Sequence, residues 1–287
     1  MKTSSSLLVL LSSFLLSSAT LLVDYHGGDA ASVLGNVELE GQELGCKILN
    51  GQAGNACFIK PEPDSATGKN SLHFKRDPHF RRAEVKALYT SANKAVVDKT
   101  YYIGYNFRLS KAYEDLVIFQ WKKWDKTAEP QQNIPLYVFF NENLDLTIEY
   151  TIPGGTGSNR EVVWTGPVSV GANTNHHLAF VINTANDGTG WAEFYLDGVQ
   201  QNFNAAYGGG KRLKNVYLFT GDTSPKFGIY RGEAAAGADD GDKYCPANNI
   251  YTGETAPSGT DHIFNSWIYR VQISDSSLSE VAEAAGL

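Results

Sequence analysis

The sequence has little apolar periodicity of the helical kind, a single methionine, three cysteines and no apolar run long enough to span a bilayer. Basic residues are also scarce: 24 lysines and arginines stand against 31 acidic residues, which gives a net charge of −7. A nucleic-acid binder is usually basic, so no nucleic acid is expected as a partner. The missing apolar run argues equally against a membrane as a partner.

Several catalytic motifs are missing too. The chain contains no Gly-x-Ser-x-Gly elbow, no His-Glu-x-x-His zinc motif and no phosphate-binding loop of the Walker type. It also lacks the Glu-x-Asp-x-x-Glu strand that many sandwich-fold glucanases use. Glu38 and Glu40 alternate as they would on a strand, but they precede the main series of strands. Hydrolysis by a pair of carboxylates is therefore the weaker enzymatic interpretation.

Aromatic residues and glycine are abundant, with 15 tyrosines, 14 phenylalanines and 28 glycines. Short runs that alternate apolar and polar residues recur along the chain, and Asp197-Gly198 is a strong hairpin signal between two of them. One short helix is expected at residues 277–285. Many short strands with almost no helix predict an all-β fold, a single-domain β-sandwich of jelly-roll type with a concave groove. The expected strands cover residues 71–74, 83–88, 100–109, 116–122, 136–141, 144–150, 161–164, 177–183, 191–196, 199–203, 215–220, 226–230 and 264–273.

The first 19 residues have the pattern of a secretory signal peptide. Lys2 gives a positive start, an apolar run follows at residues 7–16, and Ala19 ends a small-residue cleavage site. We therefore expect a secreted, extracellular protein with one domain at residues 20–287. Removing the signal takes away Lys2 and no acidic residue, so 23 basic residues face 31 acidic ones and the net charge becomes −8. Secretion permits a disulfide, and Cys46 and Cys57 flank a turn-rich segment as the expected pair, which leaves Cys245 over.

Three segments alternate polar and apolar residues with period 2. They are Arg82-Ala83-Glu84-Val85-Lys86, Phe119-Gln120-Trp121-Lys122 and Lys226-Phe227-Gly228-Ile229-Tyr230. On a strand, alternate residues point to one face, so each segment has one apolar face and one polar face. If the three strands share a sheet, its polar face carries Arg, Lys, Gln and Tyr. The clustering of lysine and arginine in these segments predicts a basic groove on an acidic protein, which suits an anionic ligand.

Together the three segments resemble the polysaccharide lyases with a β-jelly-roll fold. Alginate lyases of family 7 have Arg-x-Glu-x-Arg, Gln-Ile-His and Tyr-Phe-Lys-Ala-Gly-x-Tyr-Asn-Gln strands in this order. Here Lys86 and Lys122 replace the last Arg and the His, and the Asn-Gln ending is missing. The sequence is more similar to the fungal-type glucuronan lyases of polysaccharide lyase family 20. That similarity rests on Arg-Arg-Ala-Glu-Val-Lys, Phe-Gln-Trp-Lys, Gly-Ile-Tyr-Arg-Gly-Glu and Tyr-Arg-Val-Gln-Ile.

The resemblance implies endo-cleavage of β-1,4-linked polyglucuronate by β-elimination. A base removes the proton on C5, the carboxylate takes up the developing charge, and the C4 oxygen leaves with a proton. In glucuronate the C5 hydrogen and the C4 oxygen lie on the same side, so one residue can serve both steps. Tyr230 suits that role, while Gln120, Arg82 and His79 are candidates for holding the carboxylate. If Tyr230 is not the base, a histidine takes its place. The expected substrate-binding residues are Lys122, Lys226, Arg231, Lys86 and His73.

The resemblance also implies a bound structural calcium ion. Calcium needs hard oxygen ligands, and in related sandwiches the ion ties an early turn to the start of the final strand. Asp261 or Asn265 would serve at one end and the turn at Asn70 at the other. The expected partner is an anionic polysaccharide, and we expect a monomer. Two alternatives stay open: a lyase for another polyuronate such as alginate, and a non-catalytic carbohydrate-binding jelly-roll module.

Overall fold

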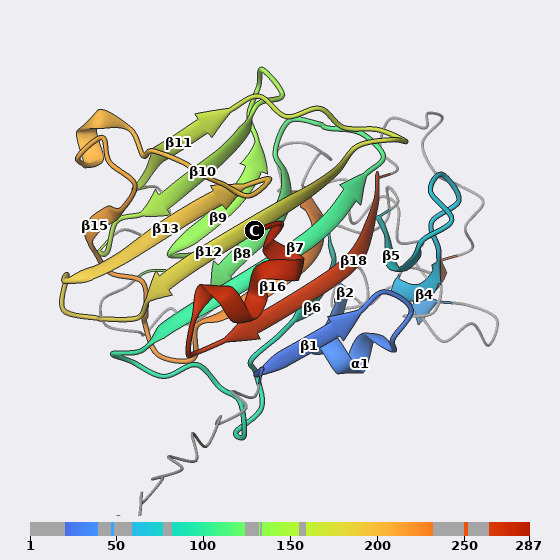
Figure 1. Ribbon diagram of the computed structural model, residues 1–287, viewed down its shortest axis with the longest axis horizontal. Helices are drawn as coiled ribbons and strands as arrows, with labels where there is room; N and C mark the ends of the chain where they lie inside the picture. The colour runs from blue at the N-terminus through green and yellow to red at the C-terminus, as the bar shows by residue number, and fades with distance from the viewer. Residues whose placement is uncertain are drawn as a thin grey trace, which may run out of the picture.

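The computed structural model describes residues 21–39, 47–48, 59–76, 82–123, 132, 134–154, 159–231, 250–251 and 264–287. In this part of the chain two large antiparallel sheets pack face to face (Figure 1). The predicted all-β sandwich is thereby confirmed. The expected signal peptide and the three cysteines lie outside the described residues, so the signal and the disulfide stay predictions.

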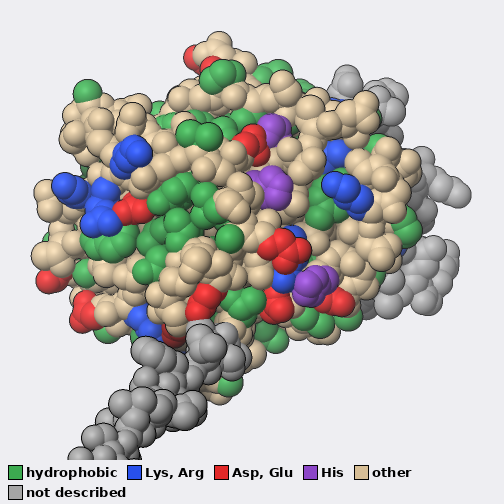
Figure 2. Space-filling view, viewed as in Figure 1, with side chains coloured by type: hydrophobic (Ala, Val, Ile, Leu, Met, Phe, Trp, Pro, Cys, Tyr) green, Lys and Arg blue, Asp and Glu red, His purple; other side chains and the backbone are tan. Residues whose placement is uncertain are grey.

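The front sheet in Figure 1 has nine strands. In spatial order these are β14 (Val199–Gln200), β13 (Gly190–Leu196), β12 (Asn175–Asn183), β7 (Thr100–Leu109), β18 (Phe264–Ser274), β5 (Asn70–Arg76) and β4 (Ile59–Pro63), with β1 (Val23–His26) beside β18 and β15 (Leu213–Val216) beside β13. Its outer face carries side chains of both charges scattered among apolar ones, so neither sign gathers there (Figure 2).

The rear sheet has seven strands. Their order is β11 (Arg160–Gly166), β10 (Leu146–Thr151), β9 (Leu136–Phe140), β8 (Leu116–Lys122), β16 (Ser224–Arg231), β6 (Arg82–Lys86) and β2 (Asn36–Leu39). A further two-stranded parallel pair joins β3 (Lys47–Ile48) to β17 (Ile250–Tyr251).

The core lies between the two large sheets and is rich in aromatic rings. Phe119 of the rear sheet stacks on Phe180 of the front sheet with ring centres 4.8 Å apart. Phe227 meets Tyr105 edge to face at 5.2 Å. Each such side chain, fully buried, contributes about 1.5–3 kcal/mol. The inward face of each rear strand is thereby fixed, and its alternate residues must point outward.

The elements outside the sandwich are short. The expected C-terminal helix forms as a 3₁₀ turn, η3 (Leu278–Val281), followed by α5 (Ala282–Ala285). It packs on β7 at Gly104, where a Cβ atom would lie 2.7 Å from the Val281 carbonyl oxygen. A second 3₁₀ turn, η1 (Ala205–Tyr207), precedes β15. None of the helices in the described residues has the length and apolar character needed to cross a membrane.

The N-terminal segment departs from expectation. Residues 20–45 have a glycine-rich sequence without long alternation, yet their described part forms β1, α1 (Ala31–Leu34) and β2. β1 pairs with the final strand, and β2 pairs with β6. Both pairings are non-local, so local pattern did not reveal them. β2 matters for the site below because it extends the rear sheet next to β6.

Candidate functional site

The three segments singled out by their alternation are neighbours in the rear sheet, in the order β8-β16-β6. Tyr230 lies directly opposite Arg82, and Lys226 lies opposite both Lys86 and Gln120. The intervening side chains of β16, such as Phe227, belong to the core. The polar side chains therefore share the outer face of the rear sheet. We call this set the outer-face site: Arg82, Glu84, Lys86, Gln120, Lys122, Lys226 and Tyr230.

An irregularity in β8 is needed to place Gln120 on this face. Val117 belongs to an outer apolar cluster, whereas Ile118 and Phe119 both belong to the core. The register with β9 shifts between Val117 and Phe119, as expected for a β-bulge. Gln120 then points outward again.

The close approach of β16 to β6 depends on a glycine. Gly228 lies opposite Glu84 and has a φ of +131°. A Cβ atom at this position would meet the Ala83 carbonyl oxygen at 2.3 Å. Any other residue would push the two strands apart, and with them Arg82 and Tyr230.

Glu84 organises the centre of the outer-face site. It is fully buried, and its Oε1 accepts a hydrogen bond from Gln120 Nε2 at 2.6 Å. Arg82 Nε lies 3.3 Å from the other carboxylate oxygen, and the Arg82 guanidinium carbon lies 4.9 Å from the centre of the Tyr230 ring. Because a carboxylate accepts only, the Gln120 amide must turn its nitrogen toward Glu84. One carboxylate thus sets the orientation of both the amide and the guanidinium.

Gln120 has unused hydrogen-bonding capacity. Its Oε1 is buried and has no hydrogen-bond partner among the residues that the structure describes. The amide nitrogen gives one hydrogen to Glu84 and keeps a second. Ser224, opposite Lys122, also has a buried hydroxyl without a hydrogen bond in the described part of the chain. Buried polar atoms in native proteins are nearly always satisfied, so these atoms indicate a place for a polar ligand.

Sequence analysis set aside Glu38, but β2 brings it into this site. Its Oε2 accepts a hydrogen bond from Arg82 Nη1 at 2.9 Å and another from Lys226 Nζ. Burial raises the pKa of the carboxyl, but the combined attraction and hydrogen bonds of Lys226 and Arg82 outweigh it and hold the pKa below its usual value. The sequence contained a signal for this placement, because polar and apolar residues alternate through Asn36, Val37 and Glu38 as on a strand. Its neighbour Glu40 lies outside the described residues.

The lysines make this face positive. Lys122 and Lys226 are buried, and Lys86 is half-buried. Burial lowers the pKa of Lys86; attraction by Glu38 opposes this shift, and repulsion by Lys226 and Lys94 adds to it. Four cationic side chains of the outer-face site face two carboxylates, Glu38 and Glu84. The balance favours an anionic ligand.

An apolar cluster adjoins Tyr230 on the same face. It consists of Val117, Ile134, Tyr137 and Phe139, with Tyr230 packed against it. The Tyr137 hydroxyl donates to Glu149 and accepts from Arg160 Nη1 at 3.0 Å. Burial is the main reason that the pKa of Tyr137 is raised. Sequence analysis missed this cluster, because every residue of β9 is apolar or aromatic. Without polar residues in between, the sequence does not show which side chains face outward.

The remaining predicted residues do not join the outer-face site. His73 projects from β5 of the front sheet, where it stacks on Trp267 with ring centres 4.9 Å apart. Its strand neighbours Leu72 and Phe74 fill the core, so His73 points to the opposite side of the molecule from Gln120. The structure therefore does not bring His73 into the outer-face site, and a role for it in substrate binding stays a prediction. Arg231 pairs through its backbone with Leu116, while His79 and Asp261 lie outside the described residues.

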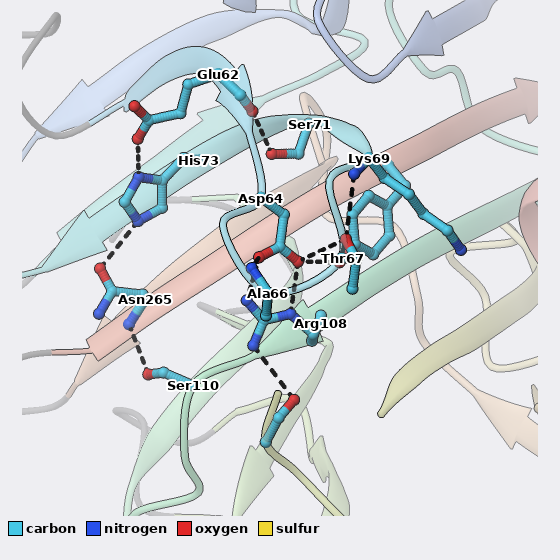
Figure 3. Close-up of polar contacts among 12 residues, drawn as sticks. Glu62, Asp64, Ala66, Thr67, Lys69, Ser71, His73, Arg108, Ser110 and Asn265 are labelled. Carbon is cyan, nitrogen blue, oxygen red and sulfur yellow. Dashed lines mark hydrogen bonds and ion pairs between the residues drawn. The ribbon is translucent and has the colours of Figure 1, made fainter. Parts of the chain in front are cut away.

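A second polar network surrounds Asp64 on the front sheet (Figure 3). Asp64 is fully buried and accepts hydrogen bonds from Arg108 Nε at 2.6 Å, from the Tyr269 hydroxyl and from the Thr67 hydroxyl at 3.1 Å. Arg108 also lies over the Trp267 ring at 3.8 Å. These groups satisfy one another, so the network ties the β4–β5 turn to β7 and β18 and offers no site for a ligand.

Two of the predicted calcium ligands, Asn265 and Asn70, do not fit one ion. Asn265 pairs with Lys75, five residues along β5 from Asn70. At about 3.3 Å per residue the two are about 16 Å apart, too far for a shared ion. The side-chain oxygen of Asn265 instead hydrogen-bonds His73 Nε2 at 2.9 Å. Within the described ranges no group of three or more His, Cys, Asp or Glu residues is arranged for a metal. Calcium stays a prediction and enters no step below.

Comparisons with known proteins identify the family and the fold. A family model described as polysaccharide lyase matches residues 52–254, more than half of the chain. The fold is similar to that of an endo-β-1,4-glucuronan lyase from the fungus Trichoderma reesei, with 18% identity and a TM-score of 0.51, over 78% of this chain and 88% of that one. At this identity the likeness shows the jelly-roll fold alone.

Two alginate lyases are more distant in structure. Aly36B has 8% identity and a TM-score of 0.49, over 89% of this chain and 97% of that one. AlgAT5, of polysaccharide lyase family 7, has 13% identity and a TM-score of 0.45, over 77% and 83% of the two chains. At these TM-scores, neither alginate lyase supports a conclusion about this chain. A search of curated proteins found no significant match.

Proposed function

Because the chain belongs to the polysaccharide lyase family, we propose that it is a secreted, endo-acting lyase that cleaves β-1,4-linked polyglucuronate by β-elimination. The observation that carries the proposal is the convergence of Gln120, Arg82 and Tyr230 on one face of one sheet. The products would be unsaturated oligouronates. Similarity of sequence motifs to glucuronan lyases supports this substrate.

The carboxylate of the substrate is the first group that must be held. The C5 proton of a uronate is weakly acidic while its carboxylate is ionised, so the developing charge needs hydrogen-bond donors and cations. In the proposed mechanism the second amide hydrogen of Gln120 donates to that carboxylate. Glu84 fixes the amide beforehand, so little reorganisation is needed when charge develops. Arg82 and Lys226 supply positive charge on the same face.

Tyr230 is the proposed proton carrier. Its phenolate oxygen takes the proton from C5, and the resulting phenol gives a proton to the departing C4 oxygen. Electrons from the broken C5–H bond form the C4–C5 double bond as the C4–O bond breaks. One tyrosine on one side of the sugar can do both, because the C5 hydrogen and the C4 oxygen lie on that side. The cation of Arg82 over the ring favours removal of the phenolic proton.

The experiment is to incubate the purified protein with polyglucuronate and, in parallel, with alginate. The unsaturated product is followed by its near-ultraviolet absorbance, and chain length by size-exclusion chromatography. We expect absorbance to rise with polyglucuronate, together with a rapid fall in chain length that marks endo-cleavage. Activity on alginate alone would show a lyase for another polyuronate. Binding without any absorbance would show a non-catalytic carbohydrate-binding module.

A further inference from the structure

Glu38 forms ion pairs with two cations of the outer-face site. Its Oε2 lies 2.9 Å from Arg82 Nη1 and also contacts Lys226 Nζ. It projects from β2, a strand that belongs to none of the three segments that define the site. Val37, beside it, packs toward the core, so Glu38 faces outward with the catalytic candidates.

The position of Glu38 is electrostatically unfavourable without its partners. In the β2–β6 register Glu38 lies directly opposite Glu84, so two carboxylates share one cross-strand pair. Like charges opposite each other destabilise a sheet. Arg82 lies within ion-pair distance of both, with Nη1 near Glu38 and Nε 3.3 Å from Glu84. The two carboxylates together hold the guanidinium between them in one orientation.

We propose that Glu38 is a positioning residue for the reaction, which holds Arg82 and Lys226 in place and reduces the positive charge that they exert on Tyr230. This inference rests on the proposed function of the outer-face site. Its physical basis is a chain of contacts: Glu38 to Arg82 at 2.9 Å, then Arg82 over the Tyr230 ring at 4.9 Å. Glu38 therefore acts on the proton carrier through another residue.

The charged groups around Glu38 come from two strands. β6 presents Arg82, Glu84 and Lys86, and β16 presents Lys226 and Tyr230. Replacing the carboxylate by an amide leaves the cations with one anion fewer. The phenolate is then better stabilised, so Tyr230 loses its proton at a lower pH. The side chains of Arg82 and Lys226 also lose a shared acceptor that fixes their geometry.

The test compares Glu38→Gln with Glu38→Asp. In Glu38→Gln we expect kcat to fall about tenfold through loss of positioning, while KM for the polyanion does not rise. The acid limb of the pH–rate profile moves down by about half a pH unit, as expected when one negative charge is removed near a partly solvated phenol. Glu38→Asp keeps the charge, so its acid limb stays at the wild-type pH even if the shorter side chain lowers kcat.

A matched control lies on the opposite side of the molecule. Glu193 of β13 pairs with Arg212 and accepts a hydrogen bond from Tyr195. Glu193→Gln makes the same chemical change within a similar ion pair, and it should leave kcat, KM and the pH profile at wild-type values. Melting temperatures of all variants report whether the fold is kept.

A second readout does not depend on activity. Tyrosine labelled with ¹³C at Cζ gives a Tyr230 signal that is assigned by its absence in Tyr230→Phe, and its titration is followed in the wild type and in Glu38→Gln. A lower titration midpoint of Tyr230 in Glu38→Gln than in the wild type supports the inference. A wild-type titration and pH profile in Glu38→Gln would overturn it. A wild-type protein inactive on every polyuronate would overturn the proposed function, and the Tyr230 titration would still decide the electrostatic effect of Glu38.

Discussion

Tyr230 is the side chain on which the proposed chemistry depends most. It is one of 15 tyrosines, and only its surroundings distinguish it. Arg82 lies over its ring, Gln120 lies on the neighbouring strand, and an apolar cluster packs against it. The cation favours the ionised ring, whereas packing against apolar groups disfavours it. Arg82 therefore provides the electrostatic support that a tyrosine base needs.

Replacing Tyr230 by Phe removes only the hydroxyl. We expect kcat to fall by about 10²–10⁴ or more, since the same group serves as base and acid, while substrate binding stays nearly unchanged. The measurement is steady-state turnover on polyglucuronate together with calorimetric binding of an oligouronate. Tyr195→Phe, which removes a hydroxyl that donates to Glu193 on the front sheet, should retain full activity. Near wild-type turnover in Tyr230→Phe would assign the base to another residue, with His79 first among them.

The β4–β5 turn shows how an element outside the site holds the sandwich together. Asp64 begins this turn, and Arg108 reaches it from β7 while Tyr269 reaches it from β18. Burial of Asp64 opposes its ionisation, but hydrogen bonds from Arg108 and Tyr269 prevail and lower its pKa to about 2. The network is therefore a stabilising link between three strands of the front sheet, and it contributes only while Asp64 is ionised.

This network predicts an acid-sensitive part of the stability. A lowered pKa in the folded state stabilises the protein above the ordinary aspartate pKa, and the contribution is lost as the pH falls from about 4 to about 2. Its size is about 2 kcal/mol. Asp64→Asn should lose that pH dependence and, by leaving Arg108 charged and buried, should lower the free energy of unfolding at neutral pH by about 3–5 kcal/mol.

The measurement is urea unfolding at a series of pH values. Asp98→Asn provides a control, because Asp98 is exposed and precedes β7, whereas Arg108 lies near the other end of that strand. It should follow the wild-type pH dependence. Equal unfolding free energies of Asp64→Asn and wild type at neutral pH would show that the network does not contribute to stability.

Charge is distributed unequally over the whole molecule. The chain carries a net charge of −7, yet the outer-face site gathers Arg82, Lys86, Lys122 and Lys226 on one sheet. On the opposite face, drawn in Figure 2, both signs are scattered. Such a distribution would direct the proposed anionic substrate to one side of the sandwich.

Binding of polyglucuronate should therefore weaken as salt rises. The Debye length falls from about 10 Å at 0.1 M to about 3 Å at 1 M, so attraction to exposed parts of the site is screened. We expect KM to rise several-fold over this range while kcat changes less. A carboxyl-reduced, neutral polymer serves as the control and should show no salt dependence in binding. A KM for polyglucuronate that does not change with salt would contradict a charge-guided site.

The sequence by itself determined the fold class, the outward faces of β6, β8 and β16, and the family. These follow from local information, because period-2 alternation fixes which side chains share a face of a strand. A motif such as Arg82-Ala83-Glu84 can likewise be recognised from the sequence without knowledge of the strands around it.

The tertiary structure decided which strands are neighbours. It placed β2, and with it Glu38, beside Arg82, and it placed His73 on the opposite sheet from Gln120. It also separated Asn70 from Asn265 along β5. The alternation of polar and apolar residues cannot show which strands are neighbours, because a strand has the same alternation in either sheet. Strand pairing is chosen by packing between residues far apart in the chain, and the bulge and the glycine that aim the site arise only within those pairings.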